Sequence, residues 1–190
     1  SILAPVQKDK IWQLARDGEI IWDNKYLQLW HVLTGQNGEN VWAIGAEKFG
    51  KFTVVKNDKS WKHKYPVITD LVISPDGENA CAIGQNGAKR FPRDTQLGDQ
   101  MWQLIVNDIP VSGFHNRIFT PVFSPDSEHV AAVCEDNGKY TVLLDGNPYQ
   151  EDFSLAWNPV FSPDGKRLLI RGFKDNKFTR TVVSTRSFLD

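Results

Sequence analysis

The side chains best suited to catalysis or metal binding are few and scattered in this chain. Among 190 residues there are four histidines and two cysteines: His31, His63, His115, His129, Cys81 and Cys134. No histidine is spaced from another histidine or from a cysteine as metal ligands usually are, and no Cys-x-x-Cys motif occurs. Motifs for a nucleophilic serine, a phosphate-binding loop or a dinucleotide are also missing. The sequence therefore predicts no catalytic residue, no metal site and no cofactor, including covalent haem and iron–sulfur clusters.

A second group with chemical potential is a Ser-Pro-Asp triplet that occurs three times. Its copies are Ser74-Pro75-Asp76, Ser124-Pro125-Asp126 and Ser162-Pro163-Asp164. The repeated aspartate could be a calcium ligand or a catalytic carboxylate. Alternatively, it caps the backbone N–H groups of a turn in which proline fixes φ. Because repetition favours a structural role, we expect these residues to belong to the scaffold.

The triplets belong to an internal repeat. Five segments can be aligned at intervals of 40, 50, 38 and 38 residues, and they begin at Ile11, Lys51, Met101, Lys139 and Lys177. The second position of each copy is aromatic, and the first four copies continue into a two-residue turn: Asp17-Gly18, Asn57-Asp58, Asn107-Asp108 and Asp145-Gly146. Such pairs tolerate the positive φ of tight hairpin turns. The repeat therefore predicts short antiparallel strands joined by hairpins.

The repeat length and the strand content together predict the fold. In one copy we expect a strand that ends at the Ser-Pro-Asp turn, followed by strands over 130–135, 140–144 and 148–153. Four antiparallel strands in about 40 residues are typical of a β-propeller blade. We therefore predict an all-β protein with one propeller domain over 1–190, containing three complete and two partial blades. The blades lie approximately at 1–26, 27–66, 67–116, 117–154 and 155–190.

Both ends of the sequence fall inside a blade. The alignment places residues 2–6 as the second strand of a blade whose first strand is missing. It places residues 178–183 as a third strand with no fourth strand after it. Because an incomplete blade leaves a sheet edge exposed, we expect this chain to be the C-terminal part of a longer propeller.

Composition excludes several kinds of partner. The 22 Lys and Arg residues nearly balance the 23 Asp and Glu residues, so no strong field attracts nucleic acid or anionic lipid. No apolar run approaches the roughly 18 residues that cross a membrane. Cys81 and Cys134 fall on the second strands of successive blades at different depths, and we expect buried thiols rather than a disulfide.

Seven tryptophans are many for this length. They could form sugar-binding platforms, but most occupy the aromatic positions of the repeat, where facing sheets would bury them. We therefore expect them to pack between blades. A separate hypothesis concerns the innermost strands, which could direct four residues toward a central channel: Trp30, Asp70, Thr120 and Asn158.

One interval of the repeat is longer because of an insertion at 85–100. The insertion contains Lys89, Arg90, Phe91 and Arg93, which are three cations around an aromatic ring. On a loop that projects from a rigid scaffold, this composition suits contact with an acidic surface of a partner protein. The alternative is a variable loop without a role.

The repeat resembles known propeller families. Pro-Val-Phe-Ser-Pro-Asp at 121–126 resembles TolB-type and WD-like repeats. The segments Lys-Tyr-Thr-Val-Leu-Leu-Asp-Gly-Asn-Pro-Tyr at 139–149 and Ala-Trp-Asn-Pro-Val-Phe-Ser-Pro-Asp-Gly at 156–165 look like the C-terminal repeats of the TmcD family. That family is the tryptophan-rich subunit of the Tmc transmembrane electron-transfer complex of sulfate-reducing bacteria. The Asn-Asp turns and Val111 depart from its pattern.

The resemblance implies a redox-inactive subunit on the cytoplasmic side of the inner membrane. Its implied partners are a membrane cytochrome b, an iron–sulfur protein and a periplasmic multihaem cytochrome c, and it supplies no catalytic residues. We therefore predict a non-catalytic propeller scaffold in a membrane-associated respiratory electron-transfer complex. One alternative is a periplasmic TolB-like propeller that bridges cell-envelope proteins. Another is the propeller part of a carbohydrate- or peptide-processing enzyme whose catalytic groups lie outside this chain.

Overall fold

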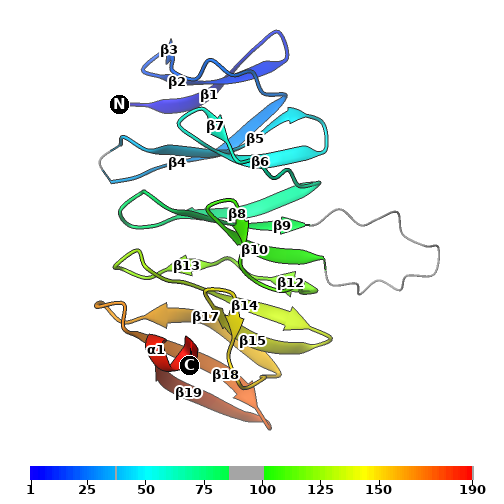
Figure 1. The fold of residues 1–190 in the computed structure, drawn as a ribbon, viewed down its shortest axis with the longest axis vertical. Coiled ribbons are helices and arrows are strands. Elements are labelled where there is room, and N and C mark those ends of the chain that lie inside the picture. The colour runs from blue at the N-terminus through cyan, green and yellow to red at the C-terminus, as the bar shows by residue number, and fades with distance from the viewer. Residues whose placement is uncertain (37, 86–100, 190) are drawn as a thin grey trace, which may run out of the picture.

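The computed structural model describes residues 1–36, 38–85 and 101–189, and its regular structure is almost entirely β-strand. Five antiparallel sheets follow one another along the chain and stack face to face in one column, with the N-terminal and C-terminal sheets at opposite ends (Figure 1). Three sheets contain the strands of a complete blade, and the first and last contain three strands each. The predicted fold, a β-propeller array with three complete and two partial blades, is confirmed.

The strands are grouped into blades numbered in chain order. Blade 1 contains β1 (Leu3–Lys8), β2 (Ile11–Arg16) and β3 (Glu19–Ile20). Blade 2 contains β4 (Gln28–Thr34), β5 (Val41–Lys48), β6 (Lys51–Lys56) and β7 (Lys59–Ser60). Blade 3 contains β8 (Val67–Ile73), β9 (Ala80–Gln85), β10 (Trp102–Val106) and β11 (Ile109–Pro110). Blade 4 contains β12 (Arg117–Ile118), β13 (Val122–Phe123), β14 (Val130–Asp136), β15 (Lys139–Leu144) and β16 (Asn147–Pro148). Blade 5 contains β17 (Leu155–Phe161), β18 (Arg167–Lys174) and β19 (Lys177–Ser184), followed by α1 (Thr185–Leu189).

The strand lengths differ from expectation in blade 4. The fourth strand, expected over 148–153, is only the two residues of β16, and the chain regains the sheet at a single bridge between Tyr140 and Phe153. The outermost strands of blades 1, 2 and 3, β3, β7 and β11, are equally short, because the chain leaves the sheet at this point to reach the next blade. The first strand of blade 4 is divided into β12 and β13 at the place where the first strands of blades 2, 3 and 5 show a register shift.

The Ser-Pro-Asp turns are closed by their own side chains. In the first of them, the backbone N–H of Glu78 donates to Asp76 Oδ1 at 2.9 Å, and the N–H of Asn79 donates to Ser74 Oγ at 2.9 Å. The same pattern recurs in the other two copies. The serine hydroxyl also donates to the aspartate, and this hydrogen bond is the main reason why the pKa of Asp76 lies below its ordinary value. These aspartates therefore hold turns together.

The two-residue hairpin turns join strands within a blade. Their first residues adopt positive φ, between 46° and 51°, as Asp17, Asn57, Asn107 and Asp145. In each case the side-chain Oδ1 accepts the backbone N–H of the residue at or just before the start of the blade's second strand, for example Val41 N–H to Asn57 at 2.8 Å. Asn and Asp are equivalent in this role, which explains why Asn-Asp can replace Asp-Gly.

The second residue of the turn connects neighbouring blades. Asp58 accepts hydrogen bonds from the backbone N–H groups of Asp23 and Asn24, at 2.8 and 3.0 Å. Asp108 accepts hydrogen bonds from Lys62 and His63 in the same way, at 2.8 and 3.1 Å. The departures from Asp-Gly in blades 2 and 3 therefore provide an inter-blade clamp, defined here as Asp58 and Asp108 with the N–H groups that they bind.

We expect Asp58→Ala to destabilise the folded state by about 1.5 kcal/mol, because two backbone donors lose a charged acceptor. Asp58→Gly removes the same acceptor but relieves the positive φ of 65°. We therefore expect a smaller loss for Asp58→Gly, and urea unfolding of both variants measures the two contributions. Wild-type stability in both variants would show that the clamp contributes nothing.

The hydrophobic core lies between blades. Ile44 and Val54 of blade 2 contact Ile68 and Ala82 of blade 3, and comparable clusters fill the other three interfaces. Trp22, Trp42 and Trp61 are buried in these clusters, as expected. Trp30 and Trp157 are not, since more than a third of each is exposed. The expectation that the tryptophans are generally buried is therefore wrong for these two.

Candidate functional site

A pocket of about 670 Å³ lies along the first strands of blades 2 and 3. Three aromatic residues, Trp12, Trp30 and Phe52, line it, and the rings of Trp30 and Phe52 meet edge to face at 5.4 Å. The polar side chains of His31 and Asp70 also line it. An apolar hollow with a few polar groups is suited to holding a small, partly aromatic molecule or a protruding side chain.

The polar side of the pocket is built by β-bulges. The pairing of β4 with β5 shifts between Trp30 and Leu33, and that of β8 with β9 shifts between Thr69 and Val72. Within these bulges His31 and Asp70 adopt positive φ, 55° and 50°. A bulge re-aims a side chain that a regular strand would direct elsewhere. The two residues therefore occupy equivalent, strained positions of successive blades.

The four residues hypothesised to line a channel are only partly brought together. Trp30 and Asp70 share the pocket. Thr120 does not line it, but its hydroxyl donates to Asp70 Oδ1 at 2.6 Å, a direct contact between blades 3 and 4. Asn158 lies apart, and its carbonyl oxygen accepts a hydrogen bond from Arg171 Nη2 at 3.1 Å.

His31 is the pocket residue that the sequence analysis missed. The interval of 40 residues between Ile11 and Lys51 aligns Trp30 with Asp70. The strand pairing instead makes Trp30 equivalent to Thr69, and therefore His31 equivalent to Asp70, so an interval of 39 residues over the first strands would have indicated His31. The other proposed contact site, Lys89, Arg90, Phe91 and Arg93, lies outside the residues that the structure describes.

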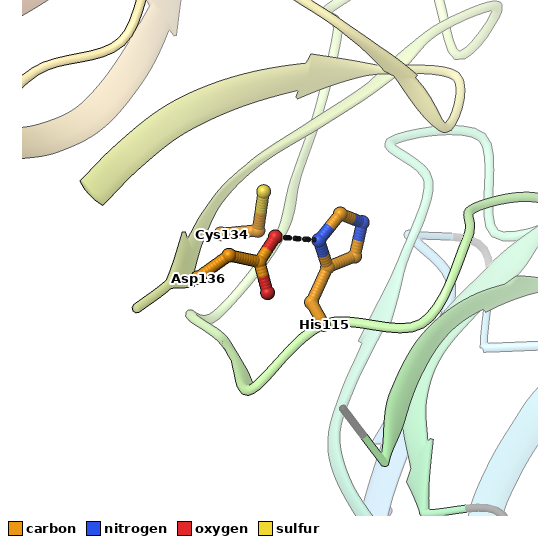
Figure 2. Close-up of side chains that lie close together, drawn as sticks. All are labelled: His115, Cys134 and Asp136. Atoms are coloured by element: carbon orange, nitrogen blue, oxygen red, sulfur yellow. Dashed lines mark hydrogen bonds and ion pairs between the residues drawn. The ribbon is translucent and has the colours of Figure 1, made fainter. Parts of the chain in front are cut away.

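The fold gathers three residues that their sequence spacing did not connect. The potential ligand atoms of His115, Cys134 and Asp136 all lie within 4.8 Å of one another (Figure 2). His115 precedes β12, whereas Cys134 and Asp136 lie on β14. His115 Nδ1 lies 2.7 Å from Asp136 Oδ2, and the N–H of Asn116 donates to the other carboxylate oxygen at 2.9 Å. Sequence spacing does not indicate this group, because strand pairing joins residues that are distant in sequence.

Imidazole, thiolate and carboxylate are all zinc ligands. In this cluster, however, the imidazole and the carboxylate bind each other. Burial, followed by the charge of Asp136, raises the pKa of the Cys134 thiol to about 12, so the sulfur is protonated near neutral pH. The arrangement is therefore a hydrogen bond between His115 and Asp136 beside a neutral Cys134 thiol. To bind here, a metal would have to displace the thiol proton and break that hydrogen bond.

The other blades show what the cluster replaces. Gly45, Gly84 and Gly172 occupy the strand position of Cys134, and each lies against a six-membered ring, those of Tyr26, Tyr65 and Phe153. A Cβ added at Gly45 would lie only 3.0 Å from the Tyr26 ring. In blade 4 the imidazole of His115 is smaller than the six-membered rings of the other blades, and Cys134 is larger than their glycines. The two changes offset each other, so the pair fills a similar volume.

Both thiols are expected to be unreactive in the folded protein. Cys81 and Cys134 are free and buried, as expected from the sequence, and burial raises the pKa of each. A thiol-exchange reagent at about pH 8 should therefore modify neither cysteine until the chain opens, because the thiolate is the nucleophile. Denaturant should make both react, and prompt reaction of the native protein would contradict this.

An exposed apolar surface lies at the end of the column. Blade 5 turns Leu168 and Ile170 toward blade 4, where both are buried. Its opposite surface, here called the C-terminal blade face, exposes six large apolar side chains: Leu155, Trp157, Val160, Phe173, Phe178 and Val182. Three of these form a mutual aromatic cluster, with ring centroids 5.7, 5.8 and 6.0 Å apart. Contiguous exposed apolar surface of this kind is typical of an interaction site.

No protein-family model matches the chain, and no curated protein matches it. Among solved structures, a eukaryotic initiation factor has a TM-score of 0.55 and 12% identity, over 99% of this chain and 49% of that chain. The Kuenenia stuttgartiensis hydrazine synthase has a TM-score of 0.45 and 15% identity, over 92% of this chain and 64% of that chain. The TolB protein of Acinetobacter baumannii has a TM-score of 0.32 and 12% identity, over 94% of this chain and 58% of that chain. The chain spans about half of the initiation factor chain. At such identity the first similarity supports the fold alone, and the lower TM-scores carry no weight.

Within the described ranges, no helix has both the length and the apolar character that crossing a membrane would require.

Proposed function

We propose that this chain is a non-catalytic β-propeller scaffold that binds a partner protein through the C-terminal blade face. The observation that carries the proposal is the exposed aromatic cluster on that face. In blades 2, 3 and 4 the equivalent surface is covered by the next sheet and forms part of the core. Phe178 is 57% exposed there, and apolar contact with a partner would remove this surface from water.

Two settings fit such a scaffold. The resemblance of 139–149 and 156–165 to TmcD favours a subunit of a respiratory electron-transfer complex at the cytoplasmic side of the membrane. A cytochrome b, an iron–sulfur protein and a multihaem cytochrome c would then be its partners. The resemblance of the Ser-Pro-Asp repeat to TolB-type propellers favours a periplasmic scaffold between envelope proteins. Both settings use the fold as a docking surface.

Affinity purification from the native cells tests the proposal. We expect a stoichiometric partner with the wild-type protein and loss of that partner with Phe178→Ser. Phe49→Ser is the matched control, because Phe49 is 89% exposed but lies at the β5–β6 turn of blade 2. Haem absorbance in the purified assembly would identify the respiratory setting, and envelope proteins would identify the other. Partner retention by Phe178→Ser, or no partner at all, would overturn the proposal.

A further inference from the structure

The two residues at the centre of the C-terminal blade face differ chemically from the residues at the equivalent position of every complete blade. In blades 2, 3 and 4, the second and third strands place two apolar residues opposite each other at this position. The pairs are Ile44 with Val54, Ile83 with Leu104, and Val133 with Val142. All six side chains are at most 1% exposed, because the next blade covers them.

In blade 5 this central pair is Arg171 and Arg180, directly opposite each other on β18 and β19. Trp157 is the next residue in the same row, on β17. Neither arginine forms an ion pair with the rest of the described chain, and Arg171 Nε is buried without a hydrogen-bond partner. Like charges at directly paired positions destabilise a sheet. Arg171 Nη2 donates to the carbonyl oxygen of Asn158, but no carboxylate of the described chain offsets the repulsion between the two guanidinium groups.

The arginines restrict what can cover the face. The residues that cover the central pair in the existing interfaces are small or apolar, such as Ala132 and Leu143 over Ile83 and Leu104. An ordinary blade of that composition would bury two guanidinium groups without counter-charges, and the loss of hydration would oppose binding. A second copy of the chain, stacked head to tail, would place blade 1 over this face. The blade 1 residues equivalent to Ala132 and Leu143 are Ala4 and Ala15, which also offer no counter-charge to the arginines.

We infer that the C-terminal blade face recognises an acidic–apolar segment of a partner protein. Carboxylates of the segment pair with Arg171 and Arg180, while its apolar side chains cover Trp157 and Phe178. The guanidinium groups are suited to this because each binds a carboxylate through two parallel N–H donors. Apolar contact supplies most of the affinity and the ion pairs supply the choice of partner. This inference rests on the proposed docking function and names its chemistry.

Two synthetic peptides with an extended, alternating pattern test the inference. One is Thr-Val-Glu-Phe-Glu-Val-Thr and the other carries Lys in place of both Glu residues. Fluorescence anisotropy of labelled peptides at low and high salt measures their affinities. We expect the wild-type protein to prefer the Glu peptide by about tenfold or more, and we expect salt to reduce the preference. Equal affinities, or binding of neither peptide at about 1 mM, would overturn the inference.

Two variants identify the residues responsible. Arg171→Glu with Arg180→Glu should reverse the preference toward the Lys peptide. Arg171→Val with Arg180→Val restores the Val133–Val142 pattern of blade 4, so it should keep the fold, as monitored by circular dichroism, and abolish the preference. Lys48→Glu with Lys51→Glu, in the β5–β6 hairpin, makes the same net charge change away from the face and should leave the preference intact.

The outcomes separate this inference from the docking function. If Phe178→Ser releases the native partner but charge reversal leaves peptide preference unchanged, docking stands and the acidic chemistry is wrong. If Phe178→Ser releases no partner while the Glu preference is present and reverses with the arginines, the face has the inferred chemistry and the docking function is wrong.

Discussion

Replacing Gly146 by alanine is expected to lower the free energy of unfolding by about 3 kcal/mol. Gly146 has a φ of 85°, which strains any residue with a Cβ atom. A Cβ at this position would also lie 2.0 Å from the backbone oxygen of Val111 and 2.9 Å from the backbone nitrogen of Ser112. Backbone atoms cannot rotate away, so blades 3 and 4 would have to separate. Urea unfolding at constant temperature measures the loss.

Gly18→Ala is the matched control for this prediction. Gly18 is the second residue of the equivalent turn in blade 1 and has a similar φ of 91°, but no atom lies within 4 Å of an added Cβ. The control should therefore cost only the backbone strain, about 1 kcal/mol. Equal losses in the two variants would show that the contact between Gly146 and Val111 is unimportant.

Exchanging the His115 and Cys134 pair for the Tyr and Gly of blades 2 and 3 is expected to show strong coupling between the two substitutions. His115→Tyr alone should cost about 2 kcal/mol, because the larger ring meets the Cys134 side chain in a filled space. Cys134→Gly alone should cost a similar amount, because it removes a buried side chain and loosens the strand. The double variant should be more stable than the sum of the single losses by about 2 kcal/mol.

Cys81→Ala provides the comparison for this cycle. Cys81 is also buried, but it lies four residues before Gln85 on β9. Gln85 pairs with Trp102, and the backbone of Trp102 forms a bridge with that of His115. Four strand residues separate positions by about 13 Å, so His115→Tyr and Cys81→Ala should be additive. Additivity of His115→Tyr with Cys134→Gly would refute the volume exchange. Chemical denaturation of the wild type, the three single variants and the two double variants decides between these outcomes.

The blade architecture could be predicted because it depends on local patterns. Aromatic positions, Asp-Gly-like turns and the Ser-Pro-Asp triplet recur at nearly constant intervals, and each acts within one hairpin. The hydrogen bonds of Asp76 and Asn57 close turns only a few residues long or join strands of one sheet. Such interactions are readable from sequence, since the partner is fixed by the turn itself.

The candidate sites could not be predicted in the same way. His115 and Cys134 meet because β14 pairs beside the segment before β12, and the register of that pairing is a tertiary property. Asp58 looked like an irregular turn residue until the stacking of blades placed it over Asp23 and Asn24. The importance of Arg171 and Arg180 appears only when their positions are compared with buried pairs in other blades.

The repeat, the strand order and the scaffold role of the Ser-Pro-Asp turns can be inferred from the chain alone, because they follow from φ preferences and short-range hydrogen bonds. Which side chains meet between blades, and which surface the described residues leave exposed, depends on the three-dimensional stacking. Inter-blade contacts join residues that are roughly 20 to 50 positions apart, such as Lys56 with Glu78 and Thr120 with Asp70, and their chemistry depends on the stacking of whole sheets. Periodicity can indicate that such an interface exists, but not which residues face each other across it.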